Sequence, residues 1–160
     1  MSKFVHIIDD EETIRDSLSF LFSSAGIQSV TWESGEAFLE RLPHPDCACI
    51  ILDVRMHGLS GPEVFERLRA RGCNARVIFL TGHADVPVAV STLKAGAYDF
   101  LEKPFNDNQI VELVRNALQS HAADEAITMS HREIEERLST LSVREKDVMR
   151  EMLDGKLNKQ

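Results

Sequence analysis

The chain has 160 residues, of which 43% are hydrophobic, and a formal net charge of −8. This length suits one well-packed domain of about 120 residues and a remainder too small for a second complete core. The charge excludes a surface that attracts nucleic acid everywhere, and the longest hydrophobic run, Cys47 to Leu52, is too short to span a membrane.

Residues 1–120 alternate short β-rich segments with helical patterns, which predicts repeated β-α units on a parallel sheet. Phe4 to Ile8 and Cys47 to Leu52 are the most continuously hydrophobic segments, so they belong in the middle of the sheet with both faces covered. The other expected strands are Ile27 to Thr31, Arg76 to Leu80 and Tyr98 to Leu101. We therefore expect an α/β fold built on a doubly wound, five-stranded parallel sheet.

Helices are expected between these strands, where hydrophobic residues recur every three to four positions. The first extends from Thr13 to Ala25 and ends at Gly26, which can adopt the left-handed backbone of a helix end. Ser34 can cap the second helix, and the last one extends from about Asp107 to Gln119.

Charged residues dominate beyond Ser120, which predicts a linker helix over 121–140. Its hydrophobic residues do not complete a coiled-coil pattern. The segment 141–160 then begins with a helix-capping pattern, because Glu145 follows Ser142 by three residues. Hydrophobic residues recur at helical spacing up to Leu153, and Gly155 is expected to end this helix.

The cysteines and the amino terminus both favour the cytoplasm. Cys47 and Cys49 are two residues apart and are expected on one face of a strand, as buried thiols rather than in a disulfide or a zinc site. Met1 leads almost directly into the first strand, without an export signal. We therefore expect a cytoplasmic protein that does not contact the membrane.

Polar residues follow four of the expected strands at the point where each strand ends. Asp9 and Asp10 follow the first strand, Asp53 the third, Thr81 the fourth, and Lys103 comes shortly after the fifth. The carboxyl ends of parallel strands meet at one edge of a sheet, where ligands bind in such folds. These groups are therefore expected to lie close together.

Their chemistry is that of phosphoryl transfer. Carboxylates within about 4 Å of each other repel by roughly 4 kcal/mol per pair at an effective dielectric of 20, so the cluster must bind a cation or protonate. Mg²⁺ fits such oxygen ligands, and Asp53 is then a candidate nucleophile that forms an acyl phosphate. Lys103 and Thr81 can contact the phosphoryl oxygens through an ammonium group and a hydroxyl.

Each group also has an ordinary explanation when taken alone. Asp9 to Glu12 can be a solvated acidic first turn, Asp53 a turn residue and Lys103 a surface lysine. The functional interpretation depends on their conjunction at four strand ends.

Five motifs within 1–120 resemble those of bacterial two-component response regulators. They are Ile8-Asp9-Asp10-Glu11-Glu12, Asp53-Val54-Arg55-Met56, Leu80-Thr81-Gly82-His83, Lys94-Ala95-Gly96-Ala97 and Phe100-Leu101-Glu102-Lys103-Pro104-Phe105. The resemblance implies a flavodoxin-like receiver domain with strand order 2-1-3-4-5. It also implies that Asp53 accepts the phosphoryl group.

The same resemblance implies the metal ligands. Asp9 and Asp10 would bind Mg²⁺ together with Asp53 and the backbone carbonyl of Arg55. The family usually has a proline where this chain has His57, which predicts a more mobile loop with an exposed histidine.

The phosphoryl contacts and a switch are implied in the same way. Thr81 and Lys103 would contact the phosphoryl group, and the Lys103–Pro104 peptide would be cis. Phe100, three residues before Lys103, matches the aromatic switch position that would move inward when the Thr81 hydroxyl shifts toward the phosphoryl group. Phosphorylation by a sensor histidine kinase would then favour a homodimer.

Residues 141–160 resemble the opening of a LuxR-type helix-turn-helix domain, and the whole chain resembles the FixJ-type branch of response regulators. The expected chain is thus a receiver over 1–120, a linker helix over 121–140 and a truncated DNA-binding domain over 141–160. Promoter DNA would be bound by the full-length protein and little or not at all by this fragment, because no recognition helix is present.

Three other functions compete with this interpretation. An aspartate-nucleophile phosphatase also uses carboxylates and Mg²⁺, but it has a second aspartate two residues after the nucleophile, where this chain has Arg55. A receiver that no longer accepts phosphate and only dimerises is a second possibility, but the intact acidic pair, Asp53, Thr81 and Lys103 argue against it. A nucleotide-binding domain would have a glycine-rich loop after the first strand. We therefore expect a signalling protein rather than a metabolic enzyme.

Overall fold

The computed structural model describes residues 3–140 and 143–157. The chain divides into two compact units, Met1–Ala122 and Ala123–Gln160. Within the described ranges, none of the helices combines the length and the hydrophobicity needed to cross a bilayer.

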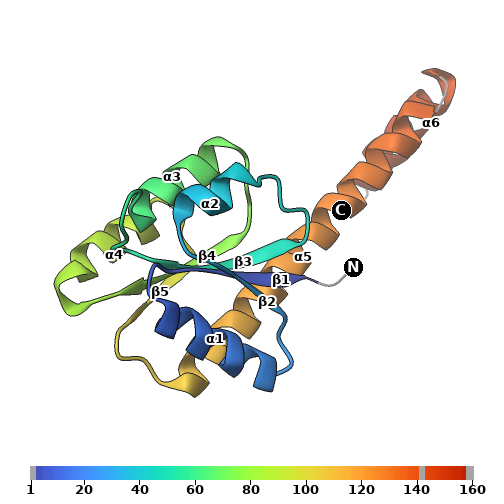
Figure 1. Ribbon diagram of the computed structural model, residues 1–160. Helices are drawn as coiled ribbons and strands as arrows, with labels where there is room; N and C mark the ends of the chain where they lie inside the picture. Colours follow the sequence, from blue (N-terminus) through green and yellow to red (C-terminus); the bar gives the residue numbers. More distant parts are fainter. Residues whose placement is uncertain (1–2, 141–142, 158–160) are drawn as a thin grey trace. The chain divides into compact units, whose positions relative to one another are not determined.

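The first unit contains a five-stranded, fully parallel sheet with the order β2-β1-β3-β4-β5 (Figure 1). This confirms the predicted fold class and strand order. The strands are β1 Phe4–Ile8, β2 Ser29–Trp32, β3 Cys47–Asp53, β4 Arg76–Thr81 and β5 Asp99–Glu102.

Helices cover both faces of the sheet, which is why its three inner strands are buried over almost their whole length. Helices α1 and α5 lie on one face and α2, α3 and α4 on the other (Figure 1), and their side chains form a hydrophobic core layer on each face. The helices are α1 Glu12–Ser24, α2 Gly35–Glu40, α3 Gly61–Ala70, α4 Val86–Lys94, α5 Asp107–Thr140 and α6 Val143–Leu157, with a short 3₁₀ helix, η1, at His83–Asp85.

The strand predictions were correct in number and order, and β1 matches to the residue. The strand expected at Ile27 to Thr31 instead begins at Ser29, because Gly26 and the hydrogen bond from Ile27 N–H to the Phe22 carbonyl still belong to the end of α1. The fifth strand lies one residue later than expected.

The prediction that Cys47 and Cys49 share a face was wrong. Cys47 packs in the core layer under α2 and α3, whereas Cys49 packs in the layer under α1 and α5. The cause is an irregularity in the β1–β3 pairing, where Phe4 opposes Cys47 but Val5 opposes Cys49. One extra residue reverses the alternation of side chains. Both thiols are free and buried, as expected.

Two predicted helix boundaries are confirmed by their hydrogen bonds and backbone angles. Ser34 caps α2 by accepting a hydrogen bond from the Ala37 N–H at 3.1 Å. Gly26, at the end of α1, has a φ of +76°, in the left-handed region that glycine adopts without strain.

Two helices continue past their predicted ends. The last receiver helix does not stop near Gln119, because α5 continues without interruption to Thr140 and absorbs the expected linker helix. His121, which is buried, and Ser120, whose hydroxyl accepts a hydrogen bond from Arg76 at 3.2 Å, still belong to the first unit. Likewise α6 passes Gly155 and ends at Leu157, since an interior glycine costs a helix only about 1 kcal/mol. The predicted cap Ser142 lies outside the described residues.

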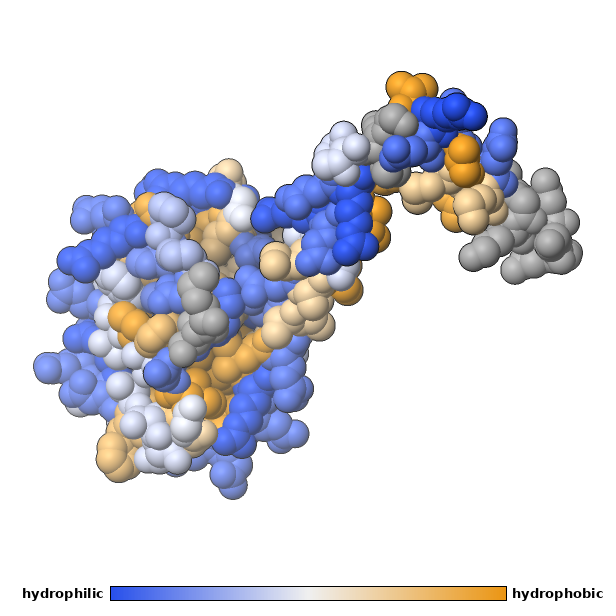
Figure 2. All heavy atoms as spheres, turned by 90° about the vertical axis from the view of Figure 1, so that its right-hand side faces the viewer, coloured by the Kyte–Doolittle hydropathy of each residue, from blue (hydrophilic) through white to orange (hydrophobic). Residues whose placement is uncertain are grey.

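The second unit exposes many of its hydrophobic side chains. Figure 2 shows them among hydrophilic neighbours on the helical surface. They are Ile127, Met129, Ile134 and Leu138 on α5, and Val143, Val148, Met149, Met152 and Leu153 on α6.

A buried histidine lies in an aromatic cluster between β1, β2 and α2. His6 is 3% exposed, and its Nδ1 accepts a hydrogen bond from Trp32 Nε1 at 2.9 Å, while Nε2 is buried without a partner. Phe38 and His44 lie against the same ring. Burial, reinforced by His44 and only partly opposed by Asp46, lowers the pKa of His6 to about 4. His6 is therefore neutral in the folded protein at neutral pH.

Acidification should destabilise the fold through His6. The unfolded chain takes up this proton near pH 6.5, whereas the folded protein does so only near pH 4. The contribution of neutral His6 to the free energy of unfolding is therefore fully present above pH 6.5. It decreases by about 3 kcal/mol as the pH drops toward 4. Urea unfolding of His6→Gln, whose amide oxygen can still accept from Trp32, should lose this part of the pH dependence. The exposed His131→Gln is the control, and an unchanged slope in His6→Gln would contradict the assignment.

Candidate phosphoacceptor and metal site

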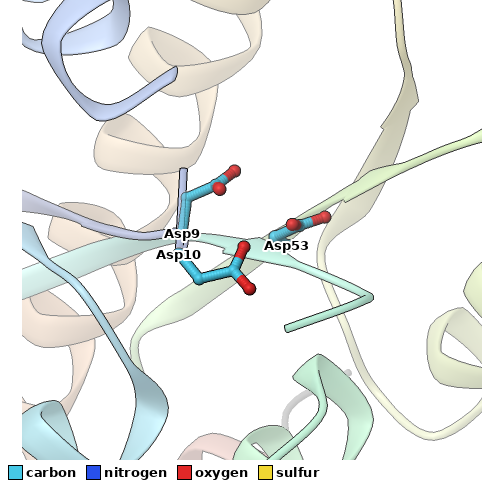
Figure 3. A group of neighbouring side chains, drawn as sticks. All are labelled: Asp9, Asp10 and Asp53. Carbon is cyan, nitrogen blue, oxygen red and sulfur yellow. The ribbon is translucent and has the colours of Figure 1, made fainter. Parts of the chain in front are cut away.

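The carboxylates predicted from the strand ends lie together at the carboxyl edge of the sheet. Asp9 follows β1, Asp10 comes next, and Asp53 is the last residue of β3. Each offers an oxygen within 4.8 Å of the others, and Figure 3 shows the three side chains beside one another. Among the described residues, this is the one group of at least three acidic, histidine or cysteine side chains close enough to share a metal ion.

Lys103 lies between two of these carboxylates. Its Nζ is 3.4 Å from Asp53 Oδ1 and 3.5 Å from Asp9 Oδ2. Its backbone N–H donates to the Thr81 carbonyl at 2.8 Å, which fixes the residue to the end of β4. Burial lowers the pKa of Lys103, but the charges of Asp53 and Asp9 outweigh burial, so that the pKa lies above its ordinary value. The Lys103–Pro104 peptide is cis, as expected from the resemblance.

Asp53 is buried next to another negative charge. Burial, followed by the repulsion of Asp9, raises the pKa of Asp53 to about 6, and Lys103 opposes the shift. Burial is also the largest cause that raises the pKa of Asp9. These two carboxylates are therefore costly to hold charged together without a further cation.

Asp10 differs from its two neighbours because it is held by His57. Its Oδ2 accepts hydrogen bonds from the His57 backbone N–H at 2.9 Å and from the ring Nδ1 at 2.8 Å. Burial raises the pKa of Asp10, but these hydrogen bonds outweigh burial and leave the pKa below its ordinary value. Asp10 therefore stays charged.

The donor set fits a small, hard divalent cation. All three side chains supply carboxylate oxygens, which Mg²⁺ prefers. Asp9 Oδ1 accepts from the Glu11 N–H at 2.9 Å, but its Oδ2 is buried and accepts no hydrogen bond, since the Lys103 Nζ is 3.5 Å away. A buried carboxylate oxygen that is not hydrogen-bonded is costly, and a metal ion would coordinate it directly.

Thr81, Phe100 and Arg55 make other contacts and are not part of this cluster. The Thr81 hydroxyl donates to the Gly82 carbonyl at 3.0 Å. Phe100 is half-buried on β5 and packs against the core layer under α2 and α3. The Arg55 side chain is exposed, and its Nε lies 2.7 Å from Asp85 Oδ2.

Three contacts of the loop after β3 were not predicted from the sequence. The exposed His57 ring bonds Asp10, the Leu59 N–H donates to Glu36 Oε1 at 2.6 Å, and Arg55 pairs with Asp85. They hold this loop to three different parts of the domain. Glu36 lies in α2 and Asp85 in η1, so neither directly follows a strand. A search for polar residues at strand ends, which located the carboxylate cluster, therefore does not find them.

Comparison with known proteins agrees with this geometry. Residues 5–115 match the family model described as the response regulator receiver domain. The chain is 53% identical over 162 residues to the C4-dicarboxylate transport transcriptional regulatory protein DctR of Rhodobacter capsulatus, covering 100% of this chain and 82% of that protein. It is 43% identical over 155 residues to the transcriptional regulatory protein FixJ of Azorhizobium caulinodans, covering 97% and 74%.

A solved structure is also similar over nearly the whole chain. The response regulator StyR superposes with a TM-score of 0.87 at 33% identity, covering 97% of this chain and 78% of StyR. The match extends past the receiver into the described helices beyond it. The chain therefore belongs to the response regulator receiver family, in the FixJ-type group of two-component transcriptional regulators.

Proposed function

We propose that this chain is a Mg²⁺-dependent phosphorylation switch whose phosphoacceptor is Asp53. The observation that carries the proposal is the cluster of Asp9, Asp10 and Asp53 oxygens within 4.8 Å of one another, with the Lys103 ammonium beside two of them. A sensor histidine kinase would be the phosphoryl donor.

Asp53 acts as the nucleophile. One of its carboxylate oxygens forms a bond to phosphorus, while the bond from phosphorus to the donor's imidazole nitrogen breaks and its electron pair returns to that nitrogen. The product on this chain is an acyl phosphate. Lys103, already 3.4 Å from Asp53 Oδ1, neutralises the charge of the incoming oxygens, and the Thr81 hydroxyl can turn from the Gly82 carbonyl to donate to them.

The Mg²⁺ ligands would be Asp9, Asp10, Asp53 and the backbone carbonyl of Arg55. When bound, the ion screens the repulsion between the phosphoryl group and the carboxylates. The buried Asp9 Oδ2, which accepts no hydrogen bond, and the raised pKa of Asp53 both support a cation in this position.

The phosphoryl signal would leave the site through Thr81 and Phe100. Rotation of the Thr81 hydroxyl toward the phosphoryl group makes room for Phe100 to turn inward, and the altered surface of α4, β5 and α5 favours a homodimer. Phe100 lies on the edge strand β5 and is only half-buried, which supports a side chain that can turn inward. The phosphoryl group acts by its different affinity for two pre-existing states.

The three parts of the chain would then have distinct tasks. Residues 1–120 would receive the phosphoryl group, and residues 121–140 would connect the receiver to the DNA-binding domain. Residues 141–160 would form the first part of that LuxR-type domain, which the full-length protein would complete. Binding of promoter DNA would place the protein in the cytoplasm. The relative at 53% identity is named for C4-dicarboxylate transport, so promoters of such transport genes are the first to test.

The alternative, an aspartate-nucleophile phosphatase, has less support. Such enzymes need a second carboxylate two residues after the nucleophile. Arg55 occupies that position, and its guanidinium pairs with Asp85. The relatives are named as transcriptional regulators, not metabolic enzymes.

Incubation with acetyl phosphate tests the proposed phosphoacceptor. With Mg²⁺, the wild-type chain should gain one phosphoryl group by intact mass and shift toward a dimer by size-exclusion chromatography. Asp53→Asn should do neither, because the amide is not a nucleophile for phosphorus. Chelation of Mg²⁺ should suppress labelling of the wild type. Equal labelling of Asp53→Asn would disprove the assignment, and sustained turnover of a small phosphate ester would favour the phosphatase.

A further inference from the structure

An ion pair links the metal-ligand loop to the beginning of α4. Arg55 lies in the loop after β3, and its Nε donates to Asp85 Oδ2 at 2.7 Å. The two residues are 30 positions apart, and Asp85 belongs to η1, which leads into α4. The Asp85 carboxylate is mostly buried, whereas the Arg55 side chain is 76% exposed. The arginine is thus the movable partner.

Asp85 occupies the N-cap position of α4 without capping it. Its side chain makes no hydrogen bond to the first turn of the helix. Its φ of −103° and ψ of 7° lie outside the extended region that a capping residue needs. The backbone is held there by the 3₁₀ hydrogen bond from the Asp85 N–H to the Gly82 carbonyl at 3.0 Å. Capping the helix would therefore require η1 to open.

The Asp85 carboxylate consequently has two alternative partners. One is the Arg55 guanidinium, which it bonds in this structure. The other is the backbone N–H of Val88, the third residue of α4, because a capping side chain bonds the second or third N–H of a helix and Pro87, the second residue, has none. Aspartate is among the best N-cap residues, and capping contributes about 1 kcal/mol. A surface ion pair contributes a similar amount, so the two states are close in free energy.

We propose that the Arg55–Asp85 ion pair is a latch that holds the η1–α4 junction in its resting conformation, and that phosphorylation of Asp53 opens it. The proposal rests on the proposed function of Asp53. Arg55 is two residues from Asp53, and a phosphoryl group presents oxygens with a charge near −2, which guanidinium binds more strongly than a single carboxylate oxygen. Asp85 is then free to cap α4.

The latch gives the site a second connection to α4, independent of Thr81. Loss of either partner should release the junction without phosphorylation. Because the Arg55 side chain is largely exposed, the ion pair is weak. We therefore expect its loss to shift the equilibrium between the closed and open η1–α4 junction about fivefold in the unphosphorylated chain.

Amide hydrogen exchange by NMR tests this directly, without Mg²⁺ or phosphate. Arg55→Gln leaves the backbone carbonyl in place, and it should speed exchange of the Asp85 N–H about fivefold. Asp85→Asn keeps a capping side chain but loses the ion pair, and it should speed exchange of the amides at 84–86 similarly. The double variant should show no further increase, because both changes break the same contact. Glu66→Gln, at an exposed residue of α3, changes the net charge in the same way as Asp85→Asn and should have no effect.

Phosphorylation completes the test. Acetyl phosphate with Mg²⁺ should speed the same exchange in the wild type but not further in Arg55→Gln, with the phosphorylated fraction measured by intact mass. Unchanged Asp85 exchange in Arg55→Gln, or additive effects in the double variant, would overturn the latch. Absence of labelling in the wild type would instead refute the proposed function, so the two failures are distinguishable.

Discussion

Replacing Lys103 by methionine should slow phosphorylation of Asp53 about 100-fold and at the same time tighten Mg²⁺ binding about tenfold. The opposite signs follow from the position of the Nζ atom, 3.4 Å from Asp53 Oδ1 and 3.5 Å from Asp9 Oδ2. In the resting site the ammonium group repels a second cation. During transfer it is the charge nearest to the incoming phosphoryl oxygens.

The magnitudes come from these two roles. Removal of one preorganised electrostatic donor typically costs 10²- to 10³-fold in rate. The ammonium group of Lys103 lies beside two carboxylates that also bind the metal, so it repels the ion. At the effective dielectric of a partly buried site this repulsion is at least about 1.4 kcal/mol, which corresponds to a factor of about ten in Mg²⁺ affinity. Loss of Lys103 should also raise the pKa of Asp53 further, because the ammonium group opposes the existing shift.

The measurement is therefore made at about pH 8, well above the pKa of about 6 of Asp53 in the wild-type chain. Isothermal titration gives the Mg²⁺ affinity, and the time course of intact mass with acetyl phosphate gives the rate. Lys94→Met, which removes an exposed lysine of α4, is the matched control and should change neither. A Lys103→Met protein that binds Mg²⁺ more weakly than the wild type would show that the lysine supports the ground-state site rather than competing with the ion.

The carboxylate cluster could be predicted from the sequence because it depends on one rule. In a parallel sheet, strand ends meet at a common edge, so Asp9, Asp10 and Asp53 converge wherever the strands are assigned correctly. That assignment needed only the continuous hydrophobic runs of β1 and β3. Errors of one or two residues at β2 and β5 did not affect it.

The contacts of the loop after β3 obey no such rule. Whether His57 reaches Asp10, or Arg55 reaches Asp85, depends on the path of an irregular segment and on rotamers, neither of which has a periodicity to read. The opposite faces of Cys47 and Cys49 were missed for a related reason, since a single irregularity in strand pairing leaves no mark in the residue types. The continuity of α5 was missed because a change of composition at Ser120 indicates a change of environment, not a break in the backbone.

Substituting alanine for Gly61 should destabilise the receiver by about 2 kcal/mol and weaken Mg²⁺ binding, although glycine to alanine usually favours a helix. Gly61 begins α3 and donates its N–H to the Val54 carbonyl at 2.9 Å. A Cβ at this position would overlap the Asp53 carbonyl oxygen and lie 3.0 Å from both the Asp53 carbonyl carbon and Val54 Cα. These are backbone atoms and cannot rotate away.

Relief of the overlap must therefore move either α3 or the phosphoacceptor itself. Overpacking of this kind costs about 1 to 3 kcal/mol, which exceeds the gain of up to about 1 kcal/mol in helix propensity. Thermal unfolding should show a decrease of roughly 8 °C in Tm. Gly82→Ala is the control, because its Cβ would meet nothing within 4 Å and its φ of −77° suits any residue. If Gly61→Ala lost stability but kept wild-type Mg²⁺ affinity, the added methyl group would have displaced α3 and left Asp53 in place. The expected link between Gly61 and the metal site would then be wrong.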